Sequence, residues 1–212
     1  MSHNALAVGM LVVLCAGNAL VFLFAWEVMG LASFLLVLSN HRRDGVRQAA
    51  WLYLLATHLG AAFLLFALFQ SIRPCGSLNL ADFAALKTLP AGQAGLLFLA
   101  FLAGFGSKAG LLPLHVWLPD AHPAAPSHVS ALMSGVMVKT GIYGLLRMAT
   151  FLPVLPGWCG AILAVLGLAG ALFGIADQAH ACRKLQAGQL NIYLFYIFAA
   201  TTLLLGVAMF TS

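Results

Sequence analysis

Apolar stretches close to the thickness of a lipid bilayer recur along this chain, and short polar segments separate them. A helix needs about 20 apolar residues to cross the hydrocarbon core. The stretches that approach or exceed this length are residues 19–38, 48–69, 93–118, 128–152, 157–176 and 189–210. A shorter apolar stretch, 5–16, precedes them and ends before Gly17 and Asn18. The pattern predicts an all-α, polytopic membrane helix bundle of about seven helices.

The composition supports the same fold class. Of the 212 residues, 63% are hydrophobic and 7% are charged, with a mean hydropathy of +1.02. A soluble domain carries about 25% charged residues, so a soluble fold is excluded. The net charge of +5 comes from loops rather than from a basic stripe, which argues against a nucleic-acid surface.

Basic residues predict the orientation in the membrane. The segment 41–47 carries three arginines, and 177–188 carries Arg183 and Lys184. The opposite loops carry Arg73, Lys87 and Arg147. Because cytoplasmic loops are enriched in Lys and Arg, we expect 41–47 and the N-terminus on the cytoplasmic side. We therefore expect a multi-pass protein of the bacterial inner membrane.

Three ionisable residues, Glu27, Lys108 and Lys139, lie deep inside apolar stretches. A charge at the bilayer centre costs roughly 2.5 to 3.5 kcal/mol on insertion scales. A glutamate could serve helix packing through one hydrogen bond, and a lysine could extend its amine towards the headgroups. Three such residues of both signs favour an ion path through the membrane instead.

A proline-rich segment follows Lys108 and predicts a broken helix. The prolines of GLLPLHVWLPDAHPAAPSH are Pro113, Pro119, Pro123 and Pro126. Irregular backbone at membrane depth is tolerated where protein or water satisfies it, and broken helices beside buried charge are a device of ion transporters. The polar stretch 71–90 contains SLNLADFAAL, which predicts a short interfacial helix.

Histidines around this segment could relay protons or make structural hydrogen bonds. His115, His122 and His128 are not spaced to share one helical face, so a metal site is disfavoured. The relay role is assigned mainly to His115. His58 is either a packing donor or a second relay. Ser134, Asp120 and Pro113 complete the candidates for relay or gating, and we predict no catalytic centre, cofactor or metal ligand in this chain.

Two motifs resemble a known family. AWEVMGLASFLLV and GSKAGLLPLHVWLPDAHPAAPSHVSALMSGVMVKTGIYGLLR are similar to the antiporter-like proton-translocating membrane subunits. These subunits occur in respiratory complex I, in multi-subunit sodium/proton antiporters and in energy-converting hydrogenases. The sequence around Lys139 resembles that of the large membrane subunit of formate hydrogenlyase. Ser134 stands where complex I homologues usually have histidine, which argues against an unbroken histidine relay in this helix.

The resemblance implies roles for the buried groups. Glu27 and Lys108 would form a buried charge pair, with the lysine on a discontinuous helix. Protonation of Lys108, modulated by Glu27, would gate proton movement along a hydrated axis, and Lys139 would continue the path. The partners would be other membrane subunits of a respiratory, antiporter or hydrogenase complex.

The resemblance also predicts the domain organisation. Residues 1–152 would be the first helical repeat, clipped at its start, and 153–176 the first helix of an incomplete second repeat. Residues 177–212 would hold a C-terminal transmembrane helix. The chain would thus be truncated or internally deleted, without a second half-channel.

Two functions remain open at this point. The first is a proton-translocating subunit, or a remnant of one, in a redox-driven complex such as a hydrogenase or NADH:quinone oxidoreductase. The second is a structural membrane subunit that moves no ions. A membrane enzyme with histidine-bound metal is a third reading, which no metal-ligand motif supports.

Overall fold

The computed structural model describes residues 2–39, 41–152 and 155–184, with side chains as far as residue 174. The chain divides into two compact units, residues 1–155 and 156–212. The helices of the first unit are α1 (Ser2–Cys15), α2 (Ala19–Leu38), α3 (Val46–Cys75), α4 (Ala91–Ala109), α5 (Leu118–Ala124), α6 (Ser127–Leu132) and α7 (Val138–Phe151). The second unit contains α8 (Gly157–Lys184).

Four of the described helices are long and apolar enough to cross a membrane. They are Ala19–Leu38, Val46–Cys75, Ser127–Phe151 and Gly157–Gly174. The span 127–151 is continuous because the π-helical turn η2 (Met133–Met137) joins α6 to α7. The predicted helical membrane bundle is confirmed. The last predicted span, 189–210, lies outside the described residues.

Several helix boundaries differ from the apolar pattern. α3 extends beyond the predicted 48–69 at both ends, and α8 continues past residue 176 to Lys184. The predicted interfacial helix is a 3-10 helix, η1 (Leu80–Thr88).

The start of α2 is capped by a side chain. Asn18 accepts hydrogen bonds from backbone N–H groups in the first turn of the helix, which have no partner within the helix.

The predicted break after Lys108 is confirmed, but the helix ends earlier than the expected Leu118. α4 stops at Ala109 because Gly110 adopts a left-handed conformation with φ 72° and caps the helix on the Gly106 carbonyl. Pro113 therefore lies in the turn between α4 and α5 and does not kink a continuing helix.

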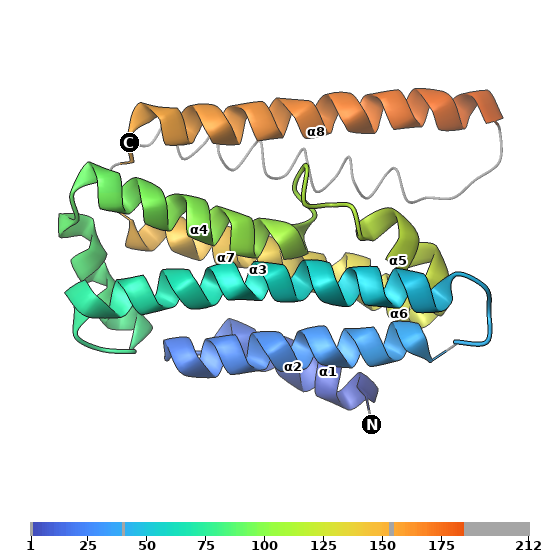
Figure 1. Cartoon of the computed structure of the whole chain (residues 1–212), viewed down its shortest axis with the longest axis horizontal. Helices are drawn as coiled ribbons and strands as arrows, with labels where there is room; N and C mark the ends of the chain where they lie inside the picture. The colour runs from blue at the N-terminus through green and yellow to red at the C-terminus, as the bar shows by residue number, and fades with distance from the viewer. Residues whose placement is uncertain (1, 40, 153–154, 185–212) are drawn as a thin grey trace. The chain divides into compact units, whose positions relative to one another are not determined.

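The long helices of the first unit pack in a ring. α2 contacts α1 and α3, α4 contacts α3 and α7, and α7 returns to α1. Figure 1 shows α2, α3 and α4 side by side. An aromatic cluster fills the interior of this ring, where Phe22, Trp26 and Phe105 have centroids 5.5 to 6.0 Å apart. Lys108 lies in the same interior.

Close approach of α4 and α7 depends on a glycine. A Cβ added at Gly141 would lie 2.6 Å from the backbone nitrogen of Ala109, whereas one at Gly135 would meet nothing within 4 Å. Gly141→Ala should therefore separate α7 from the lysine-bearing end of α4.

We expect Gly141→Ala to destabilise the protein by about 1 to 3 kcal/mol through overpacking. Gly135→Ala adds the same methyl group to the same span and serves as the matched control. Thermal unfolding of the detergent-solubilised protein would measure both, and equal melting temperatures would contradict this packing.

Candidate functional site

Lys108 is buried at the end of the broken helix. Its side chain is 1% exposed, and it is the last residue but one of α4. The carboxyl end of a helix carries a partial negative charge from its unpaired carbonyl groups. The ammonium group thus lies where the backbone itself favours a cation.

Two residues of α2 form the other side of the lysine site. Lys108 Nζ lies 4.9 Å from the centroid of the Trp26 ring, which is a cation–π distance. A Cβ added at Gly30 would lie 3.2 Å from Nζ. The absence of a side chain at Gly30 therefore makes room for the ammonium group against the α2 backbone.

Trp117 closes the break beside Lys108. Its indole N–H donates a 2.7 Å hydrogen bond to the Ser107 carbonyl, one of the carbonyls at the end of α4 that the helix leaves unpaired. The Trp117 side chain is fully buried and packs edge-on against Tyr53, with centroids 5.1 Å apart. The turn residues thus satisfy the backbone at membrane depth.

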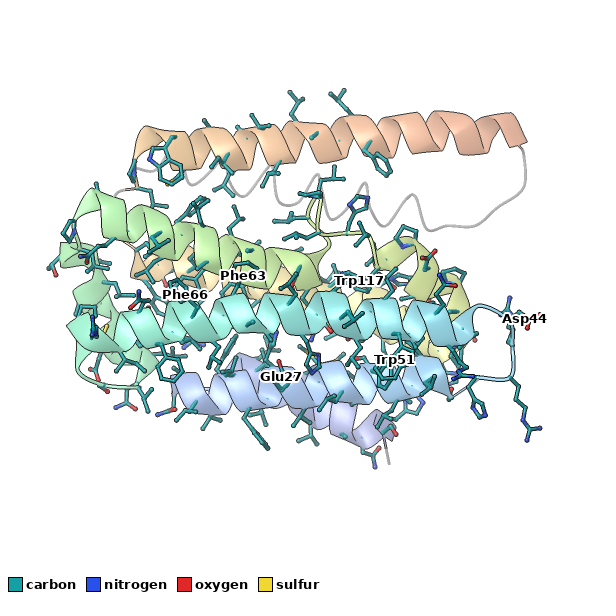
Figure 2. All side chains as sticks on the ribbon, in the orientation of Figure 1. Glu27, Asp44, Trp51, Phe63, Phe66 and Trp117 are labelled. Carbon is teal, nitrogen blue, oxygen red and sulfur yellow. The ribbon has the colours of Figure 1, made fainter. Side chains whose placement is uncertain are left out.

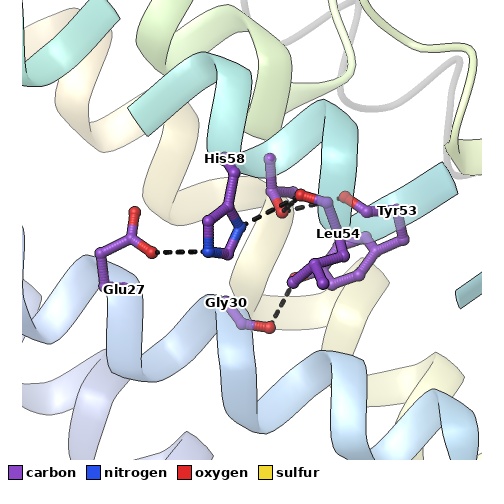
Figure 3. A network of polar contacts seen from close by, with 6 residues as sticks. Glu27, Gly30, Tyr53, Leu54 and His58 are labelled. Carbon is purple, nitrogen blue, oxygen red and sulfur yellow. Dashed lines mark hydrogen bonds and ion pairs between the residues drawn. The ribbon is translucent and has the colours of Figure 1, made fainter. Parts of the chain in front are cut away.

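Glu27 pairs with His58. Glu27 Oε2 lies 3.3 Å from His58 Nε2, and His58 Nδ1 lies 3.1 Å from the Leu54 carbonyl oxygen (Figure 3). The side chains are 32% and 45% exposed on the surface of this chain. Figure 2 shows Glu27 midway along α2, well away from Asp44 in the loop that follows.

The direct Glu27–Lys108 pair implied by the resemblance is not formed here. In the described part of the chain, the Glu27–His58 contact is the one ion pair within 4.0 Å. Glu27 nevertheless lies next to Trp26 and three residues before Gly30, the two α2 residues that line the Lys108 ammonium. The carboxylate thus lies near the lysine without contacting it.

Lys139 has a different environment from Lys108. It lies near the middle of the 127–151 span, twelve residues or roughly 18 Å from either end. Its side chain is exposed on the surface of the first unit. The next residue, Thr140, is buried and donates to the Met137 carbonyl. Lys139 therefore faces away from the interior that holds Lys108.

The remaining candidates lie on the proline-rich segment and the start of the 127–151 span. His115 is half-buried in the turn before α5, where Pro113 is exposed. Asp120 lines a cavity of about 370 Å³ together with residues 43–46, at the start of α3. Ser134 donates to the Ser130 carbonyl, and the Ser130 hydroxyl lies 2.9 Å from His122 Nδ1. In the described part of the chain, no three or more His, Cys, Asp or Glu side chains gather as metal ligands would.

Comparison with known proteins identifies the family of this chain. Residues 16–177 match the family described as "NADH:quinone oxidoreductase/Mrp antiporter, TM". The chain belongs to this antiporter-like family of membrane subunits. Hydrogenase-4 component B of Escherichia coli (strain K12) is 42% identical over 182 residues, which cover 82% of this chain and 27% of the relative.

Two solved structures share the fold. The chain is similar to the structure of the membrane-bound sulfane sulfur reductase, an archaeal respiratory membrane complex, with a TM-score of 0.70, 31% identity, and coverage of 80% of this chain and 29% of that one. The Mrp complex from Dietzia sp. DQ12-45-1b gives a TM-score of 0.79, 26% identity, and coverage of 93% and 22%. This family member thus spans about a quarter of the length of these relatives.

Sequence reasoning missed three residues that shape the lysine site, namely Trp26, Gly30 and Trp117. Trp26 and Gly30 are four residues apart, which places both on one face of α2. This spacing, next to Glu27, could have been recognised in the sequence. The hydrogen bond from Trp117 to Ser107 could not be predicted from the sequence, because it depends on how the turn after Gly110 folds back.

Trp117→Phe tests the closure of the break. The phenyl ring keeps most of the packing against Tyr53 but leaves the Ser107 carbonyl without its donor. We expect a loss of about 1 to 3 kcal/mol of stability, the cost of one unsatisfied buried polar group.

Trp51→Phe is the matched control, because Trp51 is 53% exposed. Thermal unfolding measured for both variants should show a large shift only for Trp117→Phe. Equal shifts would mean that the indole hydrogen bond does not stabilise the break.

Proposed function

We propose that this chain is a proton-translocating membrane subunit of a redox-driven or antiporter complex, with Lys108 as its central titratable group. The observation that carries the proposal is a fully buried lysine that touches no carboxylate in the described residues and is held by a helix end and an aromatic face. A permanently paired ammonium would be locked in its charged form, whereas this one can gain and lose a proton.

The proposed path runs between named groups. Glu27 modulates the charge of Lys108 from α2, and His115 relays protons in the turn beyond the break. Lys139 continues the path from the exposed face of its span. His58, Ser134 and Asp120 act as further relays or gates, and Pro113 keeps the turn from continuing as a helix.

The whole activity belongs to an assembled complex. Relatives of this family member are named as components of a hydrogenase, a sulfane sulfur reductase complex and an Mrp complex. We propose that partner membrane subunits surround this chain in a bacterial inner membrane and that electron transfer takes place in those partners. The chain itself would supply no catalytic centre and no cofactor.

Lys108→Met tests the proposal in the complete complex reconstituted into vesicles. Methionine keeps an unbranched side chain of similar volume and removes the proton-binding amine. We expect proton movement to fall to the passive leak while electron transfer continues, measured with a pH-sensitive dye and a redox assay in the same vesicles.

Lys87→Met is the matched control, since Lys87 is exposed at the end of η1. It should leave proton movement unchanged. Full proton movement in Lys108→Met would favour the structural subunit that moves no ions.

Lys139→Met gives a second test with less risk to folding. The side chain is exposed and makes no hydrogen bond or ion pair within the described residues, so its loss should leave stability within about 0.5 kcal/mol. We expect strongly reduced proton movement at unchanged melting temperature. Unreduced proton movement would remove Lys139 from the path.

A further inference from the structure

Both ring nitrogens of His58 face oxygen atoms that accept hydrogen bonds. Nδ1 lies 3.1 Å from the Leu54 carbonyl oxygen, and Nε2 lies 3.3 Å from Glu27 Oε2. A carbonyl oxygen has no proton to give. Nδ1 must therefore carry a hydrogen atom. The charge of the Glu27–His58 pair then depends on whether a second proton lies between Nε2 and the carboxyl group.

One proton has to lie between Nε2 and the carboxyl group. It resides either on the histidine, which makes an imidazolium–carboxylate pair, or on Glu27, which makes two neutral groups. Both forms have no net charge, which limits the cost of the pair at membrane depth. If the proton leaves, the bare lone pair of Nε2 faces a carboxylate, and this contact becomes repulsive.

A second cation, the Lys108 ammonium, lies against α2 about one turn from Glu27. Gly30 lies one turn beyond Glu27 on the same face of α2. Lys108 Nζ lies against the backbone of Gly30, 3.2 Å from where a Cβ would be. Tyr53 is a further titratable group beside this face, and its hydroxyl donates to the Gly30 carbonyl at 3.4 Å. It is neutral and cannot replace the cation.

We propose that Glu27 is a two-position switch, whose carboxylate alternates between His58 and Lys108 according to whether the proton shared with His58 is present. When the shared proton passes on along the proposed proton path, the carboxylate moves to the Lys108 ammonium. When a proton returns to His58, the carboxylate moves back and Lys108 loses its counter-ion. The switch rests on the proposed proton translocation and adds a competing partner for Glu27.

Two substitutions at His58 separate charge from hydrogen bonding. Arginine is always charged and should hold Glu27 on the α3 side at every pH. Glutamine keeps an N–H donor but binds no proton. In the reconstituted complex, we expect His58→Arg to lower the ratio of protons moved to electrons transferred by about ten-fold, within the usual range of coupling between two sites.

The pH dependence of proton movement distinguishes a proton-binding role of His58 from a purely structural one. Glutamine has no group that binds a proton. We expect His58→Gln to translocate protons but to lose the step that protonation of His58 gives to the wild-type pH profile. Leu55→Ala is the matched control, because Leu55 lies on the same helix, is 67% exposed and makes no polar side-chain contact. It should keep the wild-type profile.

The outcomes distinguish the switch from the function on which it rests. Proton movement in Lys108→Met would overturn the proposed function. If Lys108→Met abolishes proton movement while both His58 variants keep the wild-type ratio and profile, only the switch is overturned.

The double variant Glu27→Gln with His58→Gln decides the matter if His58→Arg fails to assemble. A switch predicts that the double variant behaves like Glu27→Gln alone, because the two residues act as one unit. Additive losses would overturn the switch.

Discussion

The burial of the Lys108 ammonium is the constraint on which the rest of the first unit depends. A charge inside a membrane protein is costly unless its surroundings replace water. Here the replacement comes from the end of α4 and the face of Trp26 rather than from a carboxylate in contact. Dipoles and ring electrons stabilise a cation while leaving it able to lose its proton. A direct ion pair would stabilise the charged form more firmly and would hinder that exchange.

The broken helix follows from this arrangement. The end of α4 can face the lysine only if the helix stops at membrane depth, and such a stop exposes carbonyl groups that lipid cannot satisfy. Gly110 and Trp117 each supply a donor, the first to the Gly106 carbonyl and the second to the Ser107 carbonyl. The turn after the break thus performs two tasks, since it caps the backbone and also closes the lysine site with a buried indole.

The fold could be read largely from the sequence because apolar length is a local property. The span 19–38 was predicted to the residue, and the break beside Lys108 followed from the density of prolines. The position of that break depended on the backbone conformation of Gly110, which no apolar pattern reveals. The partner of Glu27 was also hidden, because the pairing with His58 depends on the register of α2 against α3, and helix spacing within one segment carries no information about that register.

Acidic side chains are scarce in the helices of the first unit, and this scarcity bears on how the titratable groups interact. The chain has five acidic residues. Of these, Glu27 is the one that lies within α1 to α4 or the 127–151 span, whereas the same helices place His58, Lys108 and Lys139 at membrane depth. One carboxylate cannot neutralise three basic groups at once. Under the proposed switch, movement of Glu27 towards either His58 or Lys108 leaves the other without a counter-ion, so the proposal couples the protonation of these two groups.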